Sequence, residues 1–276
     1  MKLLFLLLLS TLMPAQAQTN SSAVLPRREK MKIYLLMGQS NMAGRGVLEK
    51  EDLTPHPRVL VFTQSKQWEL AVEPITRGEP KKTPGVGPGL VFGKIMAEAN
   101  PEITIALVPC AVGGTPLSRW MPGADLYSNA VKRAEAAAEF GTIAGIIWHQ
   151  GESDAGNQTN AATYGDRLAK MISSIRIELK SPQLPFVVGQ IGEFNYTREG
   201  KSPFARELNE TLANVPQRVP QTACVLSHGL GHKGDEVHFD AKAQRELGKR
   251  YATEMLKLEK SPRLKRAESE RKLLRK

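Results

Sequence analysis

The chain has 276 residues, of which 41% are hydrophobic and 24% are charged. This size allows one large domain with a substantial core, and the composition excludes a mainly disordered chain. The formal net charge is +10, but residues 257–276 alone hold nine basic and three acidic side chains. Because over half of the excess lies in this segment, we expect a solvated basic tail that meets anionic polysaccharide or lipid at most, and no nucleic-acid partner.

The N-terminus has the pattern of an export signal. Lys2 is followed by a continuous apolar run at 3–9 and by the small-residue sequence Ala-Gln-Ala at 15–17. This order is typical of a signal peptide, so we assign residues 1–17 to it and residues 18–30 to a polar lead-in. The apolar run at 3–9 is too short to span a bilayer, and the sequence has no other stretch of about 18 or more apolar residues. We therefore expect a secreted or periplasmic protein without a stable membrane span, of unknown oligomeric state.

The remaining chain alternates strand-like apolar runs with helical patterns. We expect strands at 32–37, 59–62, 68–72, 103–108, 142–148, 186–190 and 222–226. We expect helices at 88–100, 126–140, 161–179, 203–215 and 240–256, and a long Pro/Gly-rich loop at 78–89. Continuous apolar strands between amphipathic helices indicate a mainly parallel sheet covered on both faces. The prediction is an α/β protein, a three-layer α/β/α sandwich, in one domain over 31–256.

The two cysteines, Cys110 and Cys224, do not form a disulfide framework. Each lies at the end of an apolar run, so a single bridge and two small buried thiols are both compatible with the sequence. No Cys/His spacing matches a zinc site, and we expect neither a metal nor a cofactor.

Polar residues follow several of the predicted strands. Ser40 follows the first strand, and the segments 110–120, 149–154 and 228–238 follow three others. In a parallel sheet, ligands bind outside the carboxyl ends of the strands, where these loops meet. The sequence therefore predicts an active site formed by these four segments.

A serine, an aspartate and a histidine are candidates for a catalytic triad. Ser40 lies in a turn of small residues, where a nucleophile can be exposed at the end of a strand. Asp235 and His238 are three residues apart in a Gly-rich loop before a helix, so Asp235 can orient the ring of His238 toward Ser40. His228 and His232 compete for the role of base, but neither has an acidic partner at this spacing. The alternative for Ser40 is a helix cap.

A serine hydrolase also needs hydrogen-bond donors for the oxyanion of its intermediate. The backbone N–H of Ser40 and that of Gly113 or Gly114 are candidates, because glycine lets the backbone approach a ligand closely. The side-chain amide of Gln150 is a third candidate. The alternatives are a tight turn for the two glycines and a hydrogen bond that braces the loop for Gln150.

Other polar residues in these segments have open roles. Glu152 can tune the local charge, contact substrate hydroxyls or hold its own loop. Trp120 offers a face for stacking on a sugar and Arg119 a hydrogen-bonding fork, while Arg45 can brace the serine turn. Asn41 can serve turn formation alone. Ordinary loop packing remains an alternative for each of them.

Three ordered motifs carry a resemblance to a known family. They are GQSNMAG at 38–44, WHQGE at 148–152 and DEVHF at 235–239. The chain lacks the G-x-S-x-G pattern of ordinary α/β-hydrolases. Over 32–256 it resembles the sialate O-acetylesterase (SASA) domain of carbohydrate esterase family 6, a branch of the SGNH hydrolase superfamily. The likeness includes the loop at 113–115 and the helix at 242–250.

This resemblance implies a flavodoxin-like SGNH hydrolase fold and hydrolysis of acetyl esters on carbohydrates without a cofactor. By match of motif, Ser40 is the nucleophile, His238 the base and Asp235 its partner. Ser40, a glycine of the second block and Gln150 would form the oxyanion hole. The wider superfamily has an asparagine in its third block, where this chain has the Gln150 segment.

The predicted function is that of a secreted serine esterase acting on an acetylated carbohydrate substrate such as acetylxylan or sialylated sugars. One alternative is a lipase- or thioesterase-like member, but the sequence does not suggest the long apolar groove it would need. Another is a carbohydrate-binding protein on a degenerate esterase scaffold, which would lack a triad member. The sequence supplies all three members.

Overall fold

The structure is a computed structural model that describes residues 25–77, 83–198 and 200–261. The predicted signal peptide and residues 262–276 of the basic tail lie outside the described residues. Within the described ranges, no helix is both long enough and apolar enough to cross a membrane.

A single seven-stranded sheet forms the middle layer, in the order β3-β2-β4-β1-β5-β6-β7. Its strands are β1 (Met31–Gly38), β2 (Val59–Phe62), β3 (Trp68–Leu70), β4 (Thr104–Pro109), β5 (Thr142–His149), β6 (Phe186–Gly189) and β7 (Thr222–Val225). Every neighbouring pair is parallel except β2 and β3, which form an antiparallel hairpin. The predicted mainly parallel sheet is confirmed.

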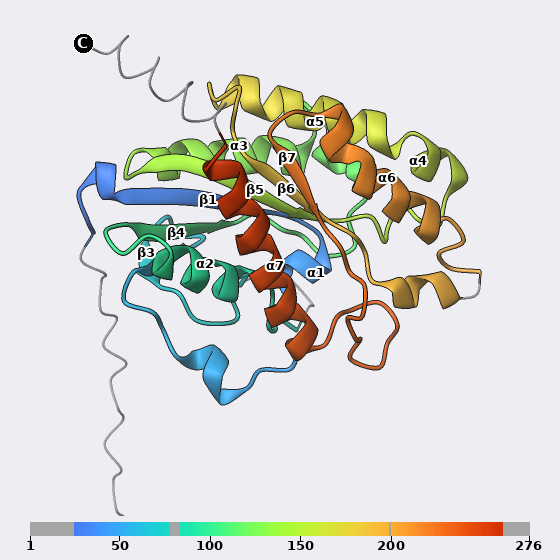
Figure 1. Ribbon diagram of the computed structural model, residues 1–276, viewed down its shortest axis with the longest axis horizontal. Helices are drawn as coiled ribbons and strands as arrows, with labels where there is room; N and C mark the ends of the chain where they lie inside the picture. Colours follow the sequence, from blue (N-terminus) through green and yellow to red (C-terminus); the bar gives the residue numbers. More distant parts are fainter. Residues whose placement is uncertain (1–24, 78–82, 199, 262–276) are drawn as a thin grey trace, which may run out of the picture.

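Helices cover both faces of the sheet (Figure 1). The helices are α1 (Ser40–Ala43), α2 (Gly89–Glu98), α3 (Asp125–Ala138), α4 (Gln158–Ala162), α5 (Tyr164–Glu178), α6 (Ala205–Arg218) and α7 (Ala241–Glu259). Short 3-10 turns are η1 (Arg28–Lys30), η2 (Lys50–Leu53), η3 (Leu117–Trp120) and η4 (Glu193–Thr197). Apolar residues of α3, α5 and α6 pack on one face, and those of α2 and α7 pack on the other. The three-layer α/β/α sandwich is therefore confirmed.

The predicted helix at 161–179 is helical in the structure except for one interruption near its start, where α4 ends and α5 begins. The break is at Thr163, whose φ and ψ of −95° and 0° depart from helical values. Its hydroxyl donates to the carbonyl of Thr159 at 2.7 Å and accepts from Arg167 Nε at 3.1 Å. A threonine side chain that bonds the nearby backbone competes with regular helix geometry, which accounts for the break.

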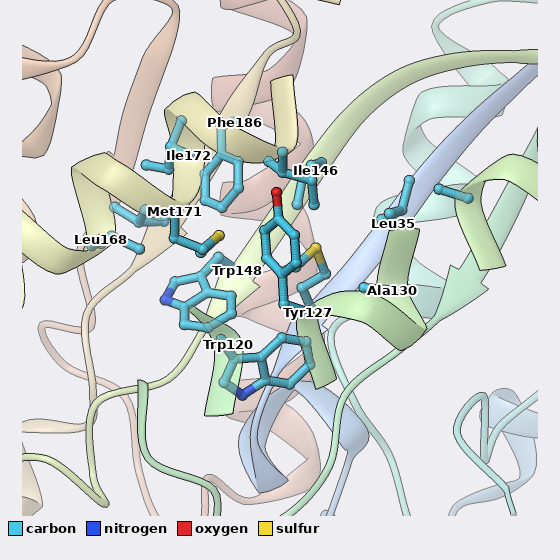
Figure 2. Packing of buried hydrophobic residues seen from close by; sticks show 14 of the residues in the cluster. Leu35, Trp120, Tyr127, Ala130, Ile146, Trp148, Leu168, Met171, Ile172 and Phe186 are labelled. Carbon is cyan, nitrogen blue, oxygen red and sulfur yellow. The ribbon is translucent and has the colours of Figure 1, made fainter. Parts of the chain in front are cut away.

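Strand β1 shows why two separate cores form. Met31, Ile33, Leu35 and Met37 belong to the cluster under α3, α5 and α6, whereas residues 34 and 36 face α2 and α7. Successive strand residues point to opposite faces, so an uninterrupted apolar strand fills both cores. Figure 2 shows the first core around Trp120, Tyr127, Trp148 and Phe186.

The position of β1 defines where a ligand can bind. The chain leaves β1 toward β2, β3 and β4 on one side, and it later adds β5, β6 and β7 on the other side. The crevice at the carboxyl ends of strands next to such a reversal is the usual ligand site of open parallel sheets. Ser40 follows β1 at this point.

Both cysteines are free thiols. Cys110 directly follows β4 and Cys224 lies in β7, and β1, β5 and β6 separate these two strands. Neighbouring strands are about 4.8 Å apart, so four steps place β4 and β7 about 19 Å apart. A disulfide needs Cα atoms within about 7 Å. Of the two alternatives from the sequence, the structure therefore favours two separate thiols.

Candidate active site

The serine turn is held against the end of β5. Gly38 has a φ of +133°, and a Cβ atom there would lie 2.1 Å from the carbonyl oxygen of His149. The backbone N–H of Gln39 donates to the same oxygen at 2.9 Å. Only glycine fits this close approach. Ser40 then begins the single-turn helix α1, and its N–H has no partner within that helix because it is the first residue.

The three predicted triad residues form one hydrogen-bonded chain. His238 Nε2 lies 3.0 Å from Ser40 Oγ, and His238 Nδ1 lies 2.7 Å from Asp235 Oδ2. The other carboxylate oxygen of Asp235 accepts from the backbone N–H groups of Val237 at 3.0 Å and of His238 at 2.8 Å. Asp235 therefore fixes both the backbone and the ring of the histidine.

The surroundings set the charges of this pair. Burial acts to raise the pKa of Asp235, but the hydrogen bonds from His238 and Val237 outweigh it and hold this pKa well below its usual range. Burial lowers the pKa of His238, and the nearby cations Lys233 and Arg45 lower it further. Asp235 raises this pKa but does not cancel the effect of burial. A neutral imidazole next to an ionised carboxylate can accept a proton from a serine near neutral pH.

The two competing histidines do not reach the serine. The side chain of His228 is 86% exposed, and its Nδ1 lies 3.2 Å from a carboxylate oxygen of Glu193. His232 Nδ1 accepts from the backbone N–H groups of Gly234 and Glu236, both at 3.1 Å. His232 thus shapes the loop that carries His238. The sequence-based choice of His238 agrees with this geometry.

The glycines predicted for the oxyanion hole lie in the loop after β4. The backbone N–H of Val112 donates to the carbonyl of Gly38 at 3.0 Å, which places this loop beside the serine turn. Gly113 is partly buried, and Gly114 is exposed with a φ of +73°. A positive φ at Gly114 reverses the direction of the backbone amides there. The loop thus holds N–H groups close to the turn that carries Ser40.

Gln150 does not have the geometry predicted from the sequence. Its side chain is fully buried, and Nε2 donates to Asp154 Oδ2 at 2.7 Å, with Gln39 Oε1 and the Thr115 carbonyl at 3.1 Å. Its Oε1 accepts from the hydroxyl of Tyr164 at 2.8 Å. Both amide hydrogens are used within the protein, so this side chain has none left for an oxyanion. The alternative, a brace between loops, fits the structure.

Trp120 does not offer the sugar-stacking face that the sequence suggested. Its side chain is 0% exposed, it packs edge-on against Trp148 with ring centroids 5.3 Å apart, and its Nε1 donates to Thr115 Oγ1 at 3.2 Å (Figure 2). A buried ring cannot stack on a sugar, so the proposed stacking face is wrong. Arg119 is instead exposed and forms an ion pair with Asp125.

The remaining candidates are buried braces. Asn41 is 0% exposed and donates to a carboxylate oxygen of Glu152, which is 8% exposed. Arg45 is 9% exposed and donates from Nη1 to the carbonyl of Gly44 at 2.7 Å. The hydrogen bond between Asn41 and Glu152 joins the segment after β1 to the segment after β5 inside the protein. The structure favours loop bracing for both and turn bracing for Arg45.

Comparison with known proteins places this site in a family. The family model described as "Carbohydrate esterase, sialic acid-specific acetylesterase" matches residues 30–257. The chain belongs to this carbohydrate esterase family. Its members are carboxylic ester hydrolases, and the resemblance seen in the three sequence motifs is confirmed.

Relatives support the same assignment. A probable carbohydrate esterase of Arabidopsis thaliana is 33% identical over 239 residues, which is 79% of this chain and 87% of the relative. A crystal structure of an Arabidopsis thaliana protein has a TM-score of 0.75 and 31% identity, covering 82% of this chain and 98% of that one. A carbohydrate acetylesterase from Xanthomonas citri has a TM-score of 0.62 and 22% identity, covering 80% and 55%. The last similarity concerns the fold alone.

Several residues of this carbohydrate esterase were missed by sequence reasoning. Asp154 is fully buried and accepts from the N–H of Leu117 at 2.8 Å, from Gln150 at 2.7 Å and from Arg167 at 3.1 Å. Gln39 Oε1 accepts from both Gln150 and the N–H of Ser153. These bonds tie the loops after β1, β4 and β5 together. For Gln39 the signal was present in the sequence, because it belongs to the motif at 38–44 and directly precedes Ser40.

The esterase has no evident metal site in the part of the chain that the structure describes. No group of three or more histidine, cysteine, aspartate or glutamate side chains is arranged to hold an ion there.

Proposed function

We propose that this carbohydrate esterase removes O-acetyl groups from carbohydrates through an acyl-enzyme intermediate on Ser40. The observation that carries the proposal is the chain of hydrogen bonds from Asp235 to His238 and from His238 to Ser40, at 2.7 and 3.0 Å. This chemistry uses a nucleophile, a base and a carboxylate that orients the base, each within hydrogen-bonding distance of the next.

In the first step, Ser40 Oγ attacks the carbonyl carbon of the acetyl group and its proton passes to His238 Nε2. The ionised Asp235 accepts from His238 Nδ1 and stabilises the imidazolium that forms. Because the pKa of Asp235 is held well below its usual range, this carboxylate stays charged throughout the working pH range.

The negative charge on the tetrahedral intermediate needs donors that are already in place. We assign this role to the backbone N–H of Ser40 and to an N–H of the loop that contains Gly113 and Gly114. Loss of one such donor typically costs about 100- to 1,000-fold in rate. Gln150 is not included, because its amide is used by Gln39, Thr115 and Asp154.

The intermediate then collapses. The bond between the acetyl carbon and the sugar oxygen breaks, and His238 gives its proton to that oxygen, which releases the carbohydrate. Water next attacks the acetyl-Ser40 ester with His238 as base, and acetate leaves as the Ser40 hydroxyl is restored. The cycle needs no cofactor.

We further propose that the protein acts outside the cytoplasm. The basis is the sequence pattern at 1–17, with the catalytic domain over 31–256 and the polar lead-in and basic tail outside it. The family description names sialic acid, and the relative from Xanthomonas citri is described as a carbohydrate acetylesterase. Acetylated glycans such as xylan or sialylated sugars are accordingly the proposed substrates.

Two alternative functions are less well supported. A carbohydrate-binding protein on this scaffold has no need of an oriented Ser40–His238 pair. A lipase- or thioesterase-like enzyme would need an extended apolar groove for the acyl chain, and a short acetyl group needs only a shallow pocket. Hydrolysis of acetate esters compared with long-chain esters separates these alternatives.

The test uses the mature protein from residue 18 and acetate release from acetylated xylans, acetylated pectins and O-acetylated sialic acids. We expect release from at least one class, and a loss of at least about 1,000-fold for Ser40→Ala. The circular dichroism spectrum and melting temperature of Ser40→Ala serve as the folding control. Equal activity of Ser40→Ala and the wild type would reject the mechanism, and saturable binding without acetate release would favour the binding protein.

A further inference from the structure

The buried side chain of Asn41 holds the backbone on both sides of the base. Its Nδ2 donates to the carbonyl of Val237 at 3.0 Å, and its Oδ1 accepts from the N–H of Phe239 at 3.1 Å. A carbonyl can only accept and a peptide N–H can only donate, so these two bonds fix which way the amide is turned. Asn41 therefore holds the residue before His238 and the residue after it.

Glu152 completes the hydrogen bonding of Asn41. The second hydrogen on Asn41 Nδ2 goes to Glu152 Oε1, and Gln244 Nε2 lies 3.4 Å from Asn41 Oδ1. Asn41 is 0% exposed and Glu152 is 8% exposed, so water does not replace these bonds. A buried amide with every position occupied has one orientation only.

These residues come from three distant parts of the chain. Asn41 follows the nucleophile, Glu152 follows β5, and His238 lies in the loop before α7. The residue next to the nucleophile thus also fixes the base. We propose that Asn41, held in orientation by Glu152, is the positioning residue that keeps His238 Nε2 within reach of Ser40 Oγ.

This proposal rests on the proposed serine esterase mechanism. His238 has no other side chain that holds both of its neighbouring peptide groups in the described part of the chain, and Asp235 acts from the opposite side through the ring and the His238 N–H. Without Asn41 the loop would keep the Asp235–His238 pair, but the His238 ring would no longer be held at its position relative to Ser40. A displacement of about 1 Å at a reacting group can cost about 100-fold in rate.

The surroundings of Glu152 indicate which substitution preserves its role. Burial and the nearby charge of Asp154 raise the pKa of Glu152. The hydrogen bond from Asn41 and the charge of Arg198 lower it, but burial is the largest effect, and the pKa is raised to about 7. Burial lowers the pKa of His149 to about 3, so the ring that faces Glu152 at 4.0 Å is neutral. What Asn41 requires at position 152 is an acceptor oxygen, which Glu152→Gln keeps and Glu152→Leu removes.

The experiment measures kcat and KM for a chromogenic acetate ester in the wild type, Asn41→Ala, Glu152→Leu and Glu152→Gln. We expect kcat to fall by about 10- to 100-fold in Asn41→Ala and Glu152→Leu, with KM changed by less than about threefold. We expect Glu152→Gln to recover most of the kcat lost in Glu152→Leu. Asn209→Ala is the matched control.

Asn209 is a suitable control because it is also a buried asparagine with two backbone bonds. It is 1% exposed, and it donates to the carbonyl of Ile191 at 2.8 Å and accepts from the Ile191 N–H at 2.9 Å. Its loss should lower the melting temperature about as much as the loss of Asn41 but leave kcat unchanged. A purely structural role for Asn41 predicts equal effects of the two alanine variants on kcat.

A second readout does not depend on the carbohydrate. A fluorophosphonate reagent forms a bond to Ser40 Oγ and releases fluoride while the serine proton passes to His238, so its rate reports activation of the nucleophile. We expect this rate to fall in Asn41→Ala and Glu152→Leu and to recover in Glu152→Gln. Unchanged kcat and labelling rate in both loss variants would overturn the proposal. Failure of the wild type to hydrolyse acetate esters would instead reject the proposed function.

Discussion

His238 Nε2 and Ser40 Oγ lie 3.0 Å apart although 198 residues separate them in the chain. The serine follows the central strand β1, whereas the loop of the histidine starts from the edge strand β7. Phe239 brings this loop back toward the centre: it is fully buried, with its ring 5.5 Å from that of His149 and 5.1 Å from that of Phe194. Apolar burial of Phe239 therefore brings the adjacent His238 within reach of Ser40.

The activity should depend on pH through His238. His238 must be neutral to accept the serine proton, so kcat/KM for an acetate ester should rise with pH as this ring loses its proton. Burial lowers the pKa of His238, so the midpoint should lie below the ordinary histidine value of about 6.5. A pH profile of kcat/KM measures it. A midpoint above that value would contradict the environment described for His238.

Asp235→Asn tests the partner of the base. The carboxylate raises the pKa of His238 against the effect of burial, so its removal should move the midpoint to lower pH. The neutral amide also cannot stabilise the imidazolium, so kcat should fall by about 100- to 10,000-fold. The same pH profile provides the measurement. An unchanged kcat with an unchanged midpoint would exclude Asp235 from the triad.

Gln150 provides a test that separates a brace from an oxyanion donor. Gln150→Ala removes one buried hydrogen bond each from Asp154, the Thr115 carbonyl and Gln39. Each lost hydrogen bond contributes about 1 kcal/mol, and more where the acceptor is charged as in Asp154, so the free energy of unfolding in urea should fall by at least about 2 kcal/mol. A direct oxyanion donor would behave differently, lowering kcat about 100-fold or more with little loss of stability.

A partly buried ion-pair cluster connects η2 to α7. Arg245 donates to both carboxylate oxygens of Asp52, at 2.9 and 2.7 Å, and also pairs with Glu49 and Glu51. The side chain of Asp52 is 3% exposed, whereas that of Glu51 is 65% exposed. Arg245→Ala leaves Asp52 as an uncompensated buried charge, and we expect a loss of about 3 kcal/mol in the free energy of unfolding.

Glu51→Ala is the control for this cluster. It removes an exposed partner of the same arginine, and exposed pairs contribute less than about 1 kcal/mol. Urea denaturation of both variants at low and at 0.5 M salt measures the difference. Equal, strongly salt-dependent losses for the two variants would show that the cluster behaves as a surface ion pair.

The cysteines should react only after unfolding. Burial raises the pKa of the Cys110 thiol to about 11 and that of the Cys224 thiol to about 12, and the thiolate is the reactive form. Iodoacetamide at pH 8 should therefore leave the native protein almost unlabelled and add two groups in denaturant, as seen by mass spectrometry. A single intact disulfide in unfolded, unreduced protein would contradict the separation of β4 and β7.

The sequence by itself determined the layer architecture and the three residues of the proposed triad. Short apolar runs that alternate with amphipathic helices indicate the strands of a covered parallel sheet, and parallel strands place their following loops at one edge. The short spacing of Asp235 and His238 is local, so the motif contained their contact. The break at Thr163 was missed because it depends on side-chain hydrogen bonds rather than on apolar periodicity.

Only the tertiary structure decided what the other polar and aromatic residues do. Gln150 and Trp120 belong to segments that reach the active-site edge, but they point inward and are fully buried. The direction of a side chain in a loop depends on partners from other strands, such as Asp154 for Gln150 and Trp148 for Trp120. The position of Asn41 between Glu152 and the base loop arises in the same way, because three distant segments must meet before its hydrogen bonds exist.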